Sequence, residues 1–167
     1  MKKSIIILLF VFTSAMCYSQ HFKFMGIPID GSIESFDAQI KSKGFVDSER
    51  YVIENTSLEK WYDGVFAGHN VNVTVFATPK TQIVYNVTVS IFDDEQSANE
   101  LCQHVKKTIE DKYKVDNKIV NSENNIRYEV GCGDIVVEYN SDEKNARIMY
   151  FDVENTNKCS DEEKEDI

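Results

Sequence analysis

Apolar residues recur at helical spacing directly after a candidate turn near residue 31. Ile33, Phe36 and Ile40 fall on one helix face, Ser32 can cap its start, and Gly44 can end it. We therefore expect a helix of about three turns here. The next segments are rich in β-branched and aromatic residues. They predict four strands, at 46–54, 58–67, 70–77 and 82–92.

The same order of patterns then occurs a second time. Asp93 can cap a second helix, and Gln96 completes a capping box. One apolar stripe follows, formed by Ala98, Leu101, Cys102, Val105, Ile109 and Tyr113. Four more strand-like runs come next, at 118–122, 125–130, 134–140 and 146–153. We predict an α+β fold of two tandem units, 20–92 and 93–153, each with one helix and four strands. The strands form one or two antiparallel sheets with the helices on one face.

Pairing Asn140 with Asn145 in the last predicted hairpin places favourable side chains opposite each other. The resulting pairs are Ile135 with Tyr150, Val137 with Ile148, and Glu138 with Arg147 on the solvent face. The same register brings Cys132 opposite Val153, at the end of the final strand.

Alternation also assigns faces in the first unit. Its apolar set is Val71, Val73, Val75, Tyr85, Val87 and Val89. The opposite face then carries short polar side chains with Phe76 and Phe92, and adjacent Trp61 and Tyr62 must point to different faces. An open face with aromatic and short polar groups predicts a binding surface. The residues assigned to it are Trp61, Asn72, Thr74, Phe76, Asn86, Thr88 and Ser90. The alternative is that these aromatic side chains pack against a helix or the other unit.

The first residues have the layout of an export signal. Lys2 and Lys3 precede an apolar run at residues 5–12 and small residues up to Ser19. We expect residues 1–19 to be removed and the protein to be periplasmic or secreted. The alternative is lipidation of Cys17, which would anchor the chain to a membrane. Met16 disfavours it, because a lipoprotein signal has a small residue before the cysteine.

Charge and hydropathy exclude two classes of partner. The formal net charge is −10, and loss of a signal with two lysines and no acid would make it −12. An acidic surface without a basic cluster repels phosphate, so nucleic-acid binding is not expected. The chain has no second apolar stretch of spanning length, so no stable membrane span is expected. Residues 154–167 form an acidic tail, which we expect to be solvated and disordered from Ser160 onward.

Three cysteines remain after signal removal: Cys102, Cys132 and Cys159. An odd count in an oxidising compartment predicts one disulfide and one free thiol. The hairpin register favours Cys132–Cys159, with Cys102 buried in the apolar stripe of the second helix. Cys102–Cys132 is the alternative pairing.

The sequence contains no recognisable catalytic, cofactor or metal motif. His21, His69 and His104 lack metal-ligand spacing. Cys102 and His104 point about 200° apart around a helix, which prevents a nucleophile–base pair. Carboxylates are numerous, so a hydrolase with a carboxylate pair is kept as an alternative function.

The order of elements resembles the β-lactamase-inhibitor-protein-like architecture of small exported bacterial proteins. The segment from Gly26 to Ser32, continued through Lys43-Gly44-Phe45, resembles the entry to such a unit, and the resemblance covers residues 24–153. Some outer-membrane assembly lipoproteins carry one copy of a related unit. The pair of disulfides usual in the inhibitors has no match here, so inhibition is assigned to no residue.

The resemblance implies a fold used for binding proteins. We therefore expect an exported, non-catalytic binding module of the cell envelope, with a protein or glycan partner. The alternatives are the hydrolase and, if Cys17 is lipidated, a lipid-anchored envelope assembly protein.

Overall fold

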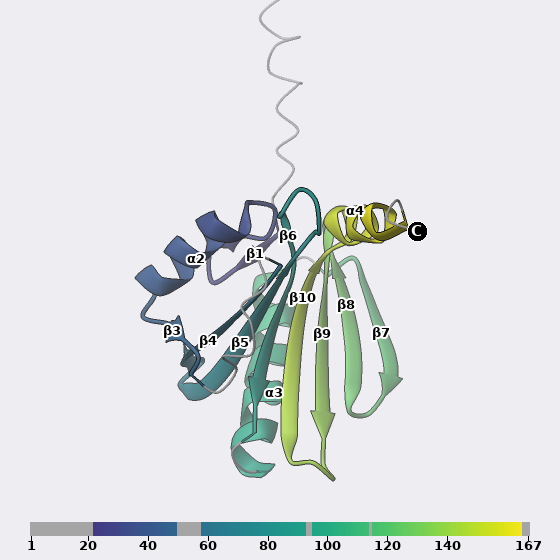
Figure 1. The fold of residues 1–167 in the computed structure, drawn as a ribbon. Helices are drawn as coiled ribbons and strands as arrows, with labels where there is room; N and C mark the ends of the chain where they lie inside the picture. Colours follow the sequence, from purple (N-terminus) through teal and green to yellow (C-terminus); the bar gives the residue numbers. More distant parts are fainter. Residues whose placement is uncertain (1–21, 50–57, 93–94, 114, 165–167) are drawn as a thin grey trace, which may run out of the picture.

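A computed structural model describes residues 22–49, 58–92, 95–113 and 115–164 (Figure 1). The predicted signal at 1–19 lies outside the described residues, and so does most of the predicted strand at 46–54. The fold is α+β, with one large antiparallel sheet, a small two-stranded sheet and three helices among the described residues.

Eight strands form the large sheet in the order β3-β4-β5-β6-β10-β9-β8-β7. Their bounds are β3 Val46–Asp47, β4 Glu59–Phe66, β5 His69–Ala77, β6 Val84–Ile91, β7 Asn117–Ser122, β8 Asn125–Val130, β9 Gly133–Asn140 and β10 Asn145–Asp152. The small sheet pairs β1 Lys23–Phe24 with β2 Ile27–Pro28. The helices are α2 Ile33–Ser42, α3 Glu95–Lys112 and α4 Val153–Lys164.

Helix α2 begins and ends where the sequence predicts. The Ser32 hydroxyl accepts a hydrogen bond from the Ser35 amide at 3.3 Å, as an N-cap does. At the other end the Gly44 amide donates to the Lys41 carbonyl at 3.0 Å, with Gly44 at a φ of +93°. That left-handed conformation is readily adopted by glycine, which explains the stop signal.

Strands β6 and β10 join the two halves of the chain into one sheet. Val89 lies opposite Ile148, and Val87 lies opposite Tyr150. The predicted register of the last hairpin is also confirmed, with Asn140 opposite Asn145. Apolar faces from both halves are therefore continuous across the β6–β10 boundary.

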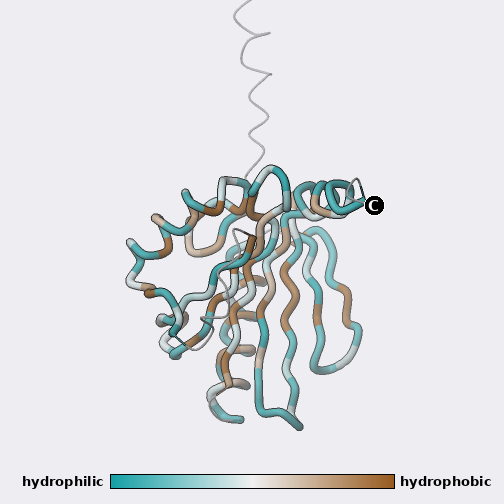
Figure 2. The backbone as a smooth tube through the Cα atoms, in the orientation of Figure 1, coloured by the Kyte–Doolittle hydropathy of each residue, from teal (hydrophilic) through white to brown (hydrophobic). Residues whose placement is uncertain are grey.

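Helices α2 and α3 cover the same face of this sheet. The Tyr62 hydroxyl donates to Asp37 of α2 at 2.8 Å, and the Tyr128 hydroxyl donates to Glu110 of α3 at 3.2 Å. Both tyrosines belong to the face that carries the buried valines and isoleucines of the central strands. Figure 1 shows α3 behind the strands, and Figure 2 shows hydrophobic stretches in the middle of the sheet.

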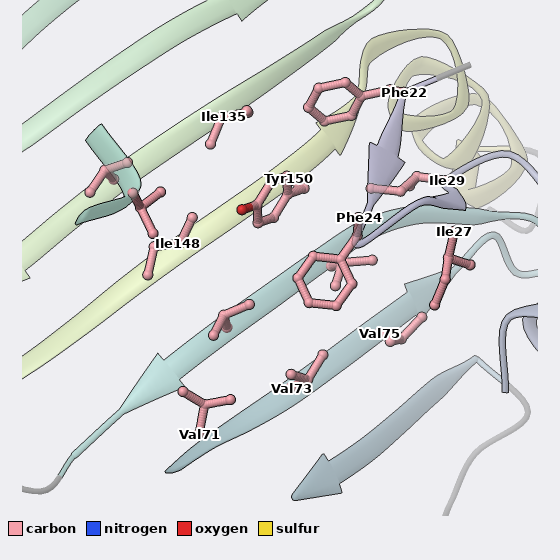
Figure 3. Close-up of a cluster of buried hydrophobic side chains, with 14 of the residues drawn as sticks. Phe22, Phe24, Ile27, Ile29, Val71, Val73, Val75, Ile135, Ile148 and Tyr150 are labelled. Atoms are coloured by element: carbon pink, nitrogen blue, oxygen red, sulfur yellow. The ribbon is translucent and has the colours of Figure 1, made fainter. Parts of the chain in front are cut away.

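The β1–β2 hairpin completes the core on this face. The Phe24 ring stacks on Phe66 with centroids 5.5 Å apart and meets Tyr150 edge-on at 5.3 Å. Figure 3 shows side chains of the hairpin region lying over those of the strands. They are Phe22, Phe24, Ile27 and Ile29 over Val71, Val73, Val75, Ile135, Ile148 and Tyr150.

The prediction of disorder from Ser160 onward is wrong for residues 160–164, which belong to α4. Asp152 caps this helix by accepting from the Asn155 amide at 2.8 Å. The buried Glu162 carboxylate binds the β5–β6 turn, accepting from the Lys80 amide at 2.7 Å and the Thr81 hydroxyl at 2.8 Å. Burial raises the pKa of Glu162, but these hydrogen bonds outweigh it and hold the pKa below its ordinary value. Tertiary contacts therefore order a polar segment.

The predicted Cys132–Cys159 disulfide is absent from the structure. The Cys132 carbonyl accepts from the Val153 amide at 3.1 Å, so Cys132 does lie where the hairpin register places it. However, α4 begins at Val153, and Cys159 lies six residues on, or about 9 Å of helical rise. The buried Cys159 thiol donates instead to Glu163 at 3.8 Å. A helix rather than a returning tail sets the position of Cys159.

Cys102 is a free, buried cysteine, as predicted, and its thiol donates to the Glu138 carbonyl at 3.5 Å. Burial raises the pKa of Cys102 to about 11, although the positive charge of Lys106 opposes this.

Since the thiolate is the reactive form, iodoacetamide at about pH 8 should leave Cys102 unmodified in the folded protein and alkylate it after unfolding. Mass spectrometry of tryptic peptides measures this. Rapid modification of Cys102 in the folded protein would contradict its burial against β9.

Candidate functional site

The candidate site is the sheet face opposite α2 and α3, where pairing aligns side chains in rows across the strands. We define the central row as Trp61, Thr74, Thr88, Met149, Val136, Arg127 and Ile119. With strands about 4.8 Å apart, this row is about 29 Å long. No described helix covers it, although α4 borders one end of the strands.

Two further rows flank the central row on the same face. One contains Glu59, Phe76, Asn86, Phe151, Asp134, Glu129 and Asn117. The other contains Asp63, Asn72, Ser90, Arg147, Glu138 and Asn125. The structure thus brings all seven residues of the predicted surface onto one face. Trp61 is half-buried there, whereas adjacent Tyr62 is fully buried on the other face.

The expected exposure is wrong for four of these residues. Asn72, Thr74, Asn86 and Ser90 are each at most 9% exposed. Their side chains are short and bond locally: Thr88 donates to Asn86 at 2.9 Å, and Asn72 donates to the Tyr62 carbonyl at 3.2 Å. Trp61, Phe76 and Thr88 are half-buried and remain the accessible members of the predicted set.

The prediction that Tyr85 shares a face with Val87 and Val89 is wrong. The β5–β6 register shifts between Phe76 and Ala77: Phe76 pairs with Asn86 and Ala77 pairs with Val84, so Tyr85 is left as an extra residue. Its ring lies 6.4 Å from that of Phe76. Simple alternation cannot reveal such a bulge, because it inserts one residue into an otherwise regular pattern.

Met149, Phe151 and Val136 are among the residues of this face that sequence reasoning missed. Their alternation was visible, since Ile148 and Tyr150 were assigned to the core face. Their importance depends on β6–β10 pairing, which places Met149 beside Thr88 and Phe151 beside Asn86. That pairing joins strands far apart in the sequence and has no local signal.

A hollow of about 450 Å³, lined by both apolar and polar side chains, lies at one end of the same face. Val46, Val65 and Phe92 line it and are 61%, 57% and 50% exposed. Polar side chains also line it, namely Asp63, Asn70, Asn72 and Ser90. Alternation placed Phe92 on this face, but no local pattern distinguished Val46 or Val65 as members of a site.

A second hollow, of about 290 Å³, lies between the sheet and α4. Phe151 and Val136 line it from the strands, and Thr156 from the helix. Beside them Arg127 Nη2 and Asp134 Oδ2 form an ion pair at 2.6 Å. The opposite charges of Arg127 and Asp134 compensate each other. The hollow therefore suits a partner surface that is neutral or carries both charges, rather than a free ion.

On the helix-covered face, the Asp37 carboxylate of α2 has partners on both the sheet and its own helix. It accepts from the Tyr62 hydroxyl at 2.8 Å and pairs with Lys41 at 3.0 Å. Burial raises the pKa of Asp37, but these partners outweigh it and lower the pKa. This arrangement fixes α2 to β4. Across the described ranges, no group of three or more His, Cys, Asp or Glu side chains is placed to hold a metal ion.

Comparison with family models, curated proteins and solved structures found no match to this chain. Within the described residues, no helix combines the length and apolar character needed to cross a membrane.

Proposed function

We propose that the protein is an exported, non-catalytic binding module of the bacterial cell envelope that binds a partner protein through the sheet face opposite α2 and α3. We also propose that residues 20–92 and 93–153 are tandem units of one helix and four strands. The order α2-β3-β4-β5-β6 followed by α3-β7-β8-β9-β10 supports this interpretation.

The central row carries the functional proposal. Its apolar members are Trp61, Met149, Val136 and Ile119, all on a face that no described helix covers. Aromatic residues, Met and Arg are enriched in protein interfaces, and this face combines all three. Aliphatic side chains in the row favour a protein partner over a glycan, because sugars pack mainly on aromatic rings.

The alternatives place different demands on the molecule. A lipid anchor at Cys17 would tether the chain but would leave the same face to bind a partner. Cys17 lies outside the described residues. A hydrolase would need two carboxylates flanking a substrate, and a panel of glycoside, peptide and ester substrates tests that activity.

Loss of the apolar side chains should weaken partner capture by about tenfold or more, as expected for interface hot spots. The test is pull-down from envelope extract with residues 20–167, comparing wild type with Trp61→Ala/Phe76→Ala and with Met149→Ala/Val136→Ala. Lys107→Ala, an exposed position on α3, is the control and should recover the wild-type amount.

Circular dichroism establishes that each variant is folded before it is compared. Equal recovery by wild type and both double variants would rule out this face as the binding surface. Protease treatment of the extract should abolish capture. Capture that survives protease would point to a glycan and contradict the proposed partner class.

A further inference from the structure

We infer that the hollow lined by Val46, Val65 and Phe92 is the anchor site for a basic segment of the partner. That segment would place an aliphatic or aromatic side chain in the hollow and a neighbouring Lys or Arg beside Asp63. The inference rests on the proposed function and adds the chemistry of the partner.

Exposed apolar surface is concentrated at this site. Six large hydrophobic residues are exposed in the described part of the chain, and Val46, Val65 and Phe92 are three of them. All three line the same hollow, although they come from different segments of the first unit. Apolar side chains gathered in this way, with polar groups around them, mark interaction sites more often than scattered exposed residues do.

The size of the hollow suits one large side chain and part of its backbone. Its volume is about 450 Å³, and pockets that enclose small ligands occupy roughly 300–1,000 Å³. An anchor side chain that packs into this hollow would cover Val46, Val65 and Phe92 and remove their exposed apolar surface from water.

The charge of the hollow favours a basic residue next to the anchor side chain of the partner. Asp63 is the sole charged residue among those described as lining it. One carboxylate oxygen accepts from the Asn72 side chain at 3.3 Å, and this bond orients the acid on the face. A Lys or Arg next to the anchor would gain a charge-assisted hydrogen bond, whereas an Asp or Glu would be repelled.

Net charge favours a different molecule over a second copy of this chain. Each copy carries a formal net charge of −10, so two copies repel each other. A basic partner would instead be attracted to the same acidic surface, and its association should weaken as salt is added.

The test is selection of short random peptides on the immobilised full-length chain, followed by fluorescence polarisation with the enriched peptides. We expect enrichment of peptides in which an aliphatic or aromatic residue adjoins Lys or Arg. Val65→Ser/Phe92→Ser should weaken their binding by about tenfold or more. Asp63→Asn should weaken it less and reduce its salt dependence.

Val120→Ser is the matched control, because Val120 is a similarly exposed valine, at 60%, on the distant edge strand β7. It should bind the peptides as wild type does. Failure to enrich any peptide, enrichment of acidic peptides, or an equal loss with Val120→Ser would overturn the inference. Peptides that require Trp61 and Phe76 but not Val65 and Phe92 would also overturn it, while leaving the proposed function intact.

Discussion

Replacing Phe24 by alanine should lower the free energy of unfolding by about 3–5 kcal/mol. Phe24 is fully buried, and its ring contacts both Phe66 and Tyr150. The β1–β2 hairpin has only two residues in each strand, so its side chains rather than its backbone pairing hold it on the sheet. Loss of the ring would leave a cavity between the hairpin and the sheet centre.

Urea denaturation followed by circular dichroism measures the change. Lys23→Ala is the matched control on the same strand, since Lys23 is exposed, and it should shift the unfolding free energy by no more than about 0.5 kcal/mol. A loss below about 1 kcal/mol for Phe24→Ala would show that the hairpin is not part of the cooperative core.

Replacing Gly133 by alanine should lower the free energy of unfolding by about 3 kcal/mol, the upper part of the usual range for overpacking. A Cβ atom at Gly133 would lie 2.5 Å from the Phe22 ring and 2.7 Å from the Phe151 carbonyl oxygen. The ring could rotate away. The carbonyl belongs to the backbone of β10, which pairs with β9 at this point, so relief would loosen the central sheet.

Gly31→Ala provides the control. A Cβ there would meet no atom within 4 Å, so the change should alter stability by less than about 0.5 kcal/mol. The two variants add the same methyl group, and their difference in urea midpoint isolates the steric effect at Gly133. Equal midpoints would mean that β9 and β10 are not held as closely as the structure places them.

Phe24→Ala and Gly133→Ala both alter the covered side of a sheet whose other side is the proposed binding surface. Gly133 precedes Asp134, and Tyr150 precedes Phe151, so neighbouring positions alternate between core and surface. Variants of the core therefore need a stability measurement before any loss of binding is assigned to the surface itself.

Local patterns were sufficient to predict much of the fold. Ser32, the apolar spacing at Ile33, Phe36 and Ile40, and Gly44 define α2 because a cap, a stripe and a stop all act within a few residues. The Asn140–Asn145 turn defined the last hairpin for the same reason. In such hairpins one register satisfies every side-chain pair at once, and a slip of one residue would reverse the faces.

Contacts between distant segments could not be predicted in this way. The β6–β10 pairing, which creates the central row, joins segments separated by a whole helix and three strands. The Tyr85 bulge and the local bonding of Asn86 changed which polar groups are accessible. Val46 and Val65 could not be assigned to a site from the sequence, because only the folded sheet places them around one hollow with Phe92.

The amino-acid sequence by itself determined helices α2 and α3, most strands and the alternation that separates a core face from a polar face, because these depend on neighbours within one turn or one hairpin. Only the tertiary structure decided that one sheet spans both halves, that α4 docks on the β5–β6 turn through Glu162, and that Cys159 lies within a helix rather than bonded to Cys132. Each of these depends on where distant segments meet, and that is set by the joint burial of their apolar faces.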